Sequence, residues 1–153
     1  MGGLLAVSAG LVLLVTPLAA GPLRAQGSDP VRALSTLAPE VMFVRATGSW
    51  SSGERSGTTR IVLLRSGSPD GAQRLFVQWL NRPEDAAGRP AVAATEEIPE
   101  IFDWRIGVGD YRVEPDANGA RIVLDGRIIG TDRNRRYLLS IGPPGEVSFS
   151  ALR

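Results

Sequence analysis

Short apolar-alternating segments, separated by turn residues, run through most of the chain from residue 41 to residue 152. Alternation of apolar and polar residues is the pattern of a strand with one face against a core. Turn signals lie between the segments, among them SPDG at 68–71, PDANG at 115–119 and GPPG at 142–145. Seven strands are clear and an eighth, an edge strand, is expected just before Pro99. The sequence predicts an all-β, mainly antiparallel fold, a small barrel or sandwich of 7–8 strands with a short N-terminal helix.

The alternation also assigns side chains to the faces of these strands. Five sets are each expected to share one inward face: Met42, Val44, Ala46, Gly48 and Trp50; Leu75, Val77 and Trp79; Phe102, Trp104, Ile106 and Val108, continued by Tyr111 and Val113 beyond a bulge at 107–109; Ala120, Ile122 and Leu124; and Val147, Phe149 and Ala151.

The N-terminal part of the chain has a different pattern. Residues 3–23 contain no charge, and small residues with two prolines follow the apolar run, which is typical of a signal peptide over residues 1–25 cleaved after Ala25 or Ala20. An uncleaved N-terminal membrane anchor is the alternative. Residues 26–40 are expected to form a short helix that starts at Asp29 and Pro30, ends by Pro39 and caps an open end or edge of the sheet. The β domain then covers residues 41–153. We therefore expect a periplasmic or secreted protein of the bacterial envelope.

Three residue types are missing, and their absence excludes many kinds of active site. The chain has no His and no Cys, and all 17 residues counted as Lys or Arg are Arg. Without His or Lys there is no Ser-His system, Schiff base or P-loop lysine, and without Cys or His no ordinary zinc or iron–sulfur site. The 16 acidic residues nearly balance the Arg residues, which argues against a nucleic-acid binder. We predict a protein without cofactor or catalytic activity.

Gly48-Ser49-Trp50 resembles the G-x-W of the first strand of lipocalin-type ligand barrels. A short helix before that strand and a series of antiparallel strands strengthen the resemblance, which implies an eight-stranded barrel with one apolar ligand inside. Trp50, Trp79, Trp104 and Tyr111 would then line the ligand site, because aromatic side chains make up much of such sites. The alternative is that the tryptophans are core residues of a filled β domain.

Two groups of charged residues are further candidates. Arg127, Arg133, Arg135 and Arg136 could contact an anion or a partner, because guanidinium groups bind carboxylates and phosphates in pairs of hydrogen bonds; a solvated turn is the alternative. Glu96, Glu97, Glu100 and Asp103 could serve a carboxylate-dependent hydrolase or bind Ca²⁺, but no calcium-loop spacing is present, and a solvated charged loop is the simpler interpretation. No metal site is predicted.

These observations leave three hypotheses about function. The first is an exported, non-catalytic protein that holds a small apolar ligand or lipid in a barrel-like domain. The second is an envelope protein–protein interaction or accessory module without a ligand cavity, which binds its partner through a sheet edge or through residues 82–100. The third, a hydrolase using the carboxylates named above, has the least support. A membrane contact is expected only through residues 3–23, if they are not removed.

Overall fold

The computed structural model describes residues 30–84 and 88–153, so the predicted signal peptide and the capping role of Asp29 lie outside the described residues. The elements follow one another as α1 (Pro30–Ser35), β1 (Val41–Ser52), β2 (Arg55–Arg65), β3 (Gln73–Asn81), β4 (Val92–Ile98), α2 (Pro99–Asp103), β5 (Ile106–Asp116), β6 (Gly119–Ile128), β7 (Asn134–Ile141) and β8 (Val147–Ala151). The predicted mainly antiparallel β fold is therefore confirmed, and the expected edge strand before Pro99 is β4.

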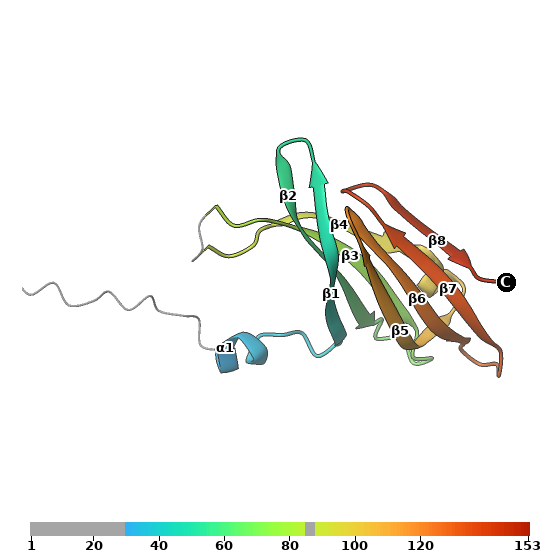
Figure 1. Ribbon diagram of the computed structural model, residues 1–153. Coiled ribbons are helices and arrows are strands. Elements are labelled where there is room, and N and C mark those ends of the chain that lie inside the picture. The colour runs from blue at the N-terminus through green and yellow to red at the C-terminus, as the bar shows by residue number, and fades with distance from the viewer. Residues whose placement is uncertain (1–29, 85–87) are drawn as a thin grey trace, which may run out of the picture. The chain divides into compact units, whose positions relative to one another are not determined.

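The strands form two four-stranded meanders and do not close into a barrel (Figure 1). One sheet has the order β1-β2-β3-β4 and the other β5-β6-β7-β8, and every pairing is antiparallel. Strand β1 contacts β5 and β6 of the other sheet. Of the two architectures that the alternation allows, the protein has that of a small sandwich.

A single cluster of buried side chains fills the space between the sheets. Its members come from both sheets and from α2: Trp50, Ile61, Leu63, Leu75, Val77, Trp79, Ile98, Ile101, Ile106, Val108, Ile122, Leu124, Tyr137, Leu139 and Ile141. The inward faces predicted for residues 75–79, 106–113 and 120–124 are confirmed, including the bulge, which lies between Val108 and Asp110.

The predicted face of β1 is wrong in its first half. Phe43 lies opposite the buried Leu63, whereas Met42 and Val44 are 43% and 45% exposed. A register shift between Ala46 and Gly48 inserts Thr47 as an extra residue, and the shift returns Trp50 to the buried side. One extra residue exchanges the two faces of a strand beyond the point where it is inserted. An alternation followed without a break through the bulge therefore assigns one half of the strand to the wrong face.

The strand predicted to begin at Phe102 begins instead at Ile106. Pro99 opens the short helix α2, a position that suits proline because its missing N–H has no partner in the first turn. The Trp104 N–H donates to the Glu100 carbonyl, and Arg105 then turns the chain with a φ of 55°. Phe102 and Trp104 are consequently 44% and 48% exposed rather than part of the core.

The helix α1 forms where Pro30 predicts its start and ends at Ser35, before Pro39. Its apolar residues Val31 and Leu34 are 71% and 70% exposed. Residues 30–35 belong to a different unit from residues 36–153, and the expected capping of the sheet by this helix stays a prediction.

Candidate interaction edge

The two sheets have four edge strands, and three of them carry features that block further strand pairing. Strand β1 has two register shifts, β4 has a register shift with Glu96 and Glu97, and β5 combines a bulge with charged residues and Pro115. Charges, proline and bulges are the devices by which natural sheets protect an exposed edge. Strand β8 reads VSFSA and has no charge, no proline and no register shift against β7. It is the unprotected edge of the described sheets.

The hydrogen bonds at the two ends of β8 determine which backbone groups point to the free edge. The Gly142 N–H donates to the Glu146 carbonyl over 2.7 Å, and the Leu152 N–H donates to the Arg136 carbonyl over 2.8 Å. Backbone groups of successive residues in an antiparallel strand point alternately to either side, so the even-numbered residues of β8 face β7. The N–H and C=O groups of Val147, Phe149 and Ala151 therefore point away from the sheet, where no described strand pairs with them.

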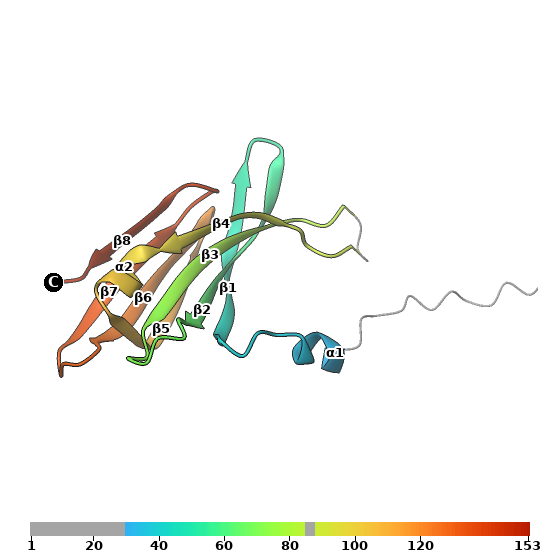
Figure 2. The same ribbon diagram turned by 180° about the vertical axis from the view of Figure 1, so that it is seen from behind.

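An aromatic cluster of Trp104, Tyr137 and Phe149 lies beside this edge. The Phe149 ring stacks on Tyr137 at a centroid distance of 5.3 Å, and Trp104 lies 6.0 Å from Phe149 and 6.5 Å from Tyr137. Tyr137 is buried, Phe149 is half-buried and Trp104 is 48% exposed. The cluster joins the end of α2 to β7 and β8, which lie near one another in Figure 2. It places partly exposed aromatic rings next to the outward backbone groups of β8.

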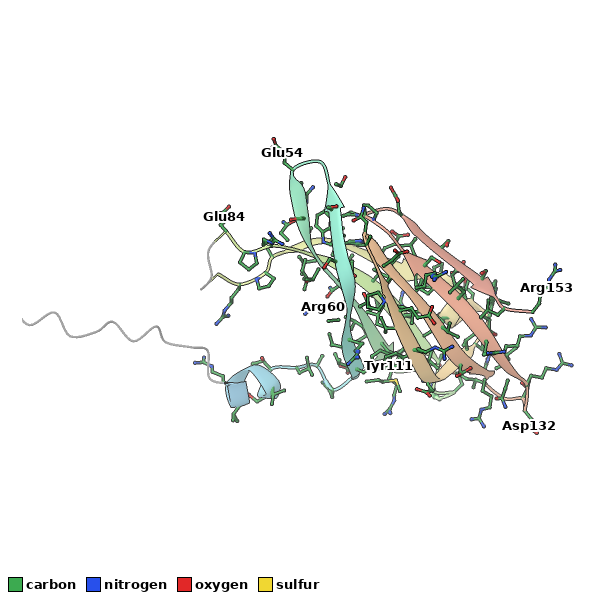
Figure 3. The ribbon with its side chains drawn as sticks, viewed as in Figure 1. Glu54, Arg60, Glu84, Tyr111, Asp132 and Arg153 are labelled. Atoms are coloured by element: carbon green, nitrogen blue, oxygen red, sulfur yellow. The ribbon has the colours of Figure 1, made fainter. Side chains whose placement is uncertain are left out.

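The other predicted aromatic site residues are dispersed and serve the core. Trp50 is 2% exposed and its indole N–H donates to the Leu80 carbonyl, 3.2 Å away. Trp79 is fully buried and donates over 2.8 Å to the carbonyl of Gly142, which directly follows β7 of the other sheet. Tyr111 is half-buried and stacks on Phe43 at 4.8 Å, where β5 faces β1 (Figure 3). The four aromatic residues proposed for one ligand site thus do not meet in one place.

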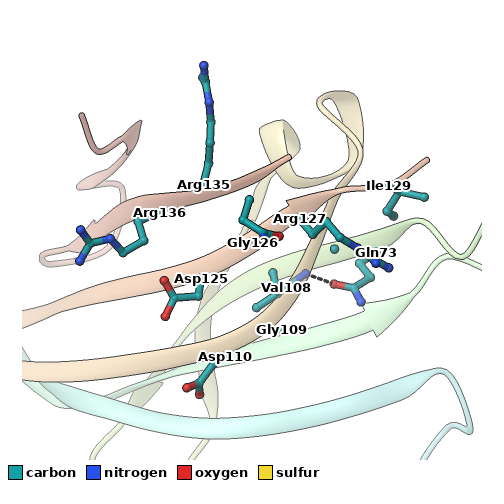
Figure 4. Close-up of a pocket in the computed structure, with 12 residues that line it drawn as sticks. Gln73, Val108, Gly109, Asp110, Asp125, Gly126, Arg127, Ile129, Arg135 and Arg136 are labelled. Atoms are coloured by element: carbon teal, nitrogen blue, oxygen red, sulfur yellow. Dashed lines mark hydrogen bonds between the residues drawn. The ribbon is translucent and has the colours of Figure 1, made fainter. Parts of the chain in front are cut away.

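Three of the four predicted arginines line a common hollow on the β5-β6-β7 sheet. It has a volume of about 700 Å³ and is lined by Arg127, Arg135 and Arg136, by Asp110 and Asp125, and by other residues that include Gln73, Gly107 and Gly109. The Gln73 side chain accepts a hydrogen bond of 2.8 Å from the Val108 N–H at its rim. Figure 4 shows that the side chains of Arg127, Arg135 and Arg136 extend in different directions. Arg133 is exposed and does not line this hollow.

The predicted acidic group is divided between two elements and two faces. Glu97 forms a two-pronged ion pair with Arg74, with both distances 2.7 Å, and this carboxylate raises the pKa of the Arg74 guanidinium. Glu96 lies opposite the buried Val77 and so faces the interior side of β4, whereas Glu100 and Asp103 belong to α2. Among the described residues, no three acidic side chains gather as a metal site would require.

One further ion pair fixes the end of α2 to the turn before β3. Asp70 lies 3.0 Å from Arg105 and accepts a hydrogen bond of 3.2 Å from the Ala72 N–H. A hydrogen bond from the Ser68 side chain, the bond from Ala72 and the charge of Arg105 together hold the Asp70 pKa below its ordinary 3.8. This contact stabilises the residue with positive φ from which the chain enters β5.

Sequence reasoning missed the free edge of β8, although its signal is present in the sequence. Residues 147–152 carry no charge, directly between Glu146 and Arg153, and β8 is the one edge strand of the described sheets that contains no charged residue. What alternation could not supply is the position of this strand at the end of its sheet, because that depends on the order in which the strands pair.

No helix in the described part of the chain is both long and apolar enough to cross a membrane. Comparison of the whole chain with models of protein families, with curated proteins and with solved structures finds no match.

Proposed function

We propose that this protein binds another polypeptide, without catalysing a reaction, and that an extended segment of the partner adds to its sheet along β8. The unprotected edge of β8 is the observation that carries the proposal. An incoming strand would exchange hydrogen bonds with the backbone of Val147, Phe149 and Ala151, which is the binding mode known as strand addition. Main-chain bonds of this kind provide affinity for many sequences, so selectivity has to come from side chains.

The side chains around the edge favour a partner segment with apolar residues at every second position. Residues of the incoming strand that point to the same side as Phe149 would meet the aromatic cluster of Trp104, Tyr137 and Phe149. Residues that point to the other side would lie beside Ser148 and Ser150, which are small and exposed. A segment that alternates apolar and polar residues satisfies both faces.

The compartment of the partner follows from the N-terminal sequence. We propose export, since residues 3–23 are uncharged and end in small residues and prolines. The partner would then be another protein of the bacterial envelope. Mass spectrometry of the protein recovered from the periplasm tests this step, with an N-terminus at residue 26 or 21 as the expected result.

Substitutions of Ala151 test the use of the edge. The Ala151 N–H points to the free side, so Ala151→Pro removes an outward donor and blocks pairing while the bonds to β7 remain; proline is tolerated at such a position. Ala151→Ser keeps the N–H and is the matched control. We expect a partner recovered from envelope extract, and then purified, to bind the Pro variant at least about tenfold more weakly than the Ser variant. Equal affinity of both variants would refute binding through β8.

A small-ligand role is the second candidate, because three predicted arginines line one hollow. With the interior of the sandwich filled by core side chains, a ligand would occupy the surface, and the guanidinium groups favour an anionic one. Native mass spectrometry of the purified protein would reveal a co-purified anion. Arg127→Ala combined with Arg136→Ala should release it, whereas Arg133→Ala, outside the hollow, should not.

A further inference from the structure

The free edge of β8 is complementary to itself when two copies meet about a two-fold axis. Its three outward residues are Val147, Phe149 and Ala151, with Phe149 in the middle. An antiparallel arrangement centred on Phe149 pairs Phe149 with Phe149 of the second copy and Val147 with Ala151 of the second copy. Each outward N–H then meets an outward C=O, so no backbone group of this edge is left without a partner. If the two copies of β8 were shifted along each other by one hydrogen-bonded pair, one of the three outward residues in each copy would have no residue of the other strand opposite it.

The charges that flank β8 favour the same antiparallel arrangement. Glu146 precedes the uncharged stretch 147–152 and Arg153 follows it. In the antiparallel pairing, Glu146 of one copy lies at the same end of the ladder as Arg153 of the other. A parallel pairing would instead bring Glu146 beside Glu146 and Arg153 beside Arg153, and like charges at adjacent strands destabilise a sheet.

The side chains of β8 fit close to a symmetry axis. On the outer face, Ser148 and Ser150 are small and exposed, so Ser148 lies opposite Ser150 of the second copy without crowding. On the inner face, the two Phe149 rings become direct neighbours, and each already stacks on its own Tyr137. Aromatic pairs across strands are among the stabilising cross-strand contacts.

We infer that, in the absence of its partner, the protein forms a two-fold dimer in which two copies of β8 pair antiparallel about Phe149 and join their sheets into one. This inference rests on the proposed function, since it assigns a second copy to the same edge. The two symmetric copies bury the same surface, which is the usual arrangement of homodimers. A partner strand would have to displace the second copy before it binds.

Introduced cysteines test the register, because the chain contains no Cys of its own. Ser148 and Ser150 of the second copy would form a pair without backbone hydrogen bonds, where the Cα atoms are about 4.5 Å apart and a disulfide fits. A mixture of Ser148→Cys and Ser150→Cys proteins, oxidised at micromolar concentration, should form the mixed disulfide roughly a hundredfold faster than a mixture of Ser148→Cys with Ser52→Cys. Ser52 is exposed at the end of β1 and reports random collision.

Two results of the cysteine experiment would overturn the inferred dimer, and both can be distinguished from a failure of the proposed function. A disulfide formed faster by either cysteine variant alone would put residue 148 or residue 150 on the axis instead of Phe149. A rate equal to that of the Ser52 control, with sedimentation of the unmodified protein as a monomer, would exclude the dimer. If partner binding is still lost in Ala151→Pro, the proposed function stands without the dimer; if the dimer forms and neither Ala151 variant alters partner binding, only the proposed function fails.

Discussion

Gly48 lies where strand β1 crosses the start of β6, and the absence of a side chain there permits the close approach of the two sheets. A Cβ at this position would overlap the carbonyl oxygen of Gly119, which belongs to the backbone and cannot turn aside. We expect Gly48→Ala to destabilise the protein by about 1–3 kcal/mol, the usual range for overpacking. Chemical denaturation measures this, with Ser49→Ala as the control, since Ser49 is exposed on the neighbouring position. An unchanged denaturation midpoint for Gly48→Ala would show that the two sheets can move apart at this position without loss of stability.

The Gly48–Trp50 pair that resembles a ligand-barrel signature therefore has a structural role at both positions. Gly48 allows two backbones to meet, and Trp50 occupies the core with its indole N–H on the Leu80 carbonyl. The sequence marks both residues as special, but the same residue types satisfy a close backbone contact and a ligand cup. Only the pairing of the strands shows which of these two roles, close backbone contact or ligand binding, the residues have.

Asp70 gives the protein a specific dependence on acid pH. Its pKa is held below the ordinary value by hydrogen bonds from Ser68 and Ala72 and by Arg105, so the folded state prefers the ionised carboxylate. A lowered pKa stabilises the fold above the unfolded value near 3.8 and ceases to do so as pH falls through the lower, folded value. We expect Asp70→Asn to unfold at a lower temperature than the wild type at pH 7. The difference should shrink only below a pH of about 4, and it should disappear once the pH has fallen below the lowered pKa of the folded state. A difference that stays constant over this acid range would contradict the assignment.

The elements of the fold were predictable to different degrees. Seven strands and their turns follow from alternation and turn residues, because each depends on its own local sequence. The helix α2 was not predicted, since Phe102 and Trp104 continue the period of the following strand, whereas Pro99 decides the local structure. The first half of β1 was assigned to the wrong face because Thr47 adds a residue that only the partner strand reveals. A bulge set by strand pairing thus accounts for the error in β1, and a helix start at a proline accounts for the error before β5.

The contact between Trp79 on β3 and Gly142 after β7 fastens one sheet to the other. Trp79 is fully buried and its indole N–H donates to the Gly142 carbonyl over 2.8 Å. Replacement by Phe removes this hydrogen bond and part of the ring, and leaves the carbonyl without its donor. We expect Trp79→Phe to lower the free energy of unfolding by about 2 kcal/mol, and Trp104→Phe, at a 48% exposed residue, by far less. Urea unfolding followed by circular dichroism compares the two, and equal losses would show that Trp79 is no more important to the fold than an exposed ring.

On the scale of the whole molecule, one sandwich core supports two different surfaces, the hollow lined by arginines and the free edge of β8. The core draws on both sheets and α2, so the sheets have to fold together. The hollow lined by arginines also has the glycines at 107 and 109 in its lining, and the free edge exists because the sheet ends at β8. The residues that form both surfaces all lie within residues 36–153.

Residues 36–153 should therefore fold as one cooperative unit in the absence of the N-terminal residues. Every buried residue of the described chain, from Thr47 onward, lies within this unit. The described residues 30–35 contribute nothing to the core cluster, so we expect the melting temperature of a chain of residues 36–153 to match that of a chain beginning at residue 26 within about 2 °C, less than a loss of 1 kcal/mol would cause. Scanning calorimetry compares the two, and a matched truncation that also removes residues 36–52, and with them β1, should abolish the transition. A large fall in melting temperature on removing residues 1–35 alone would instead show that the predicted capping helix packs on the sheet.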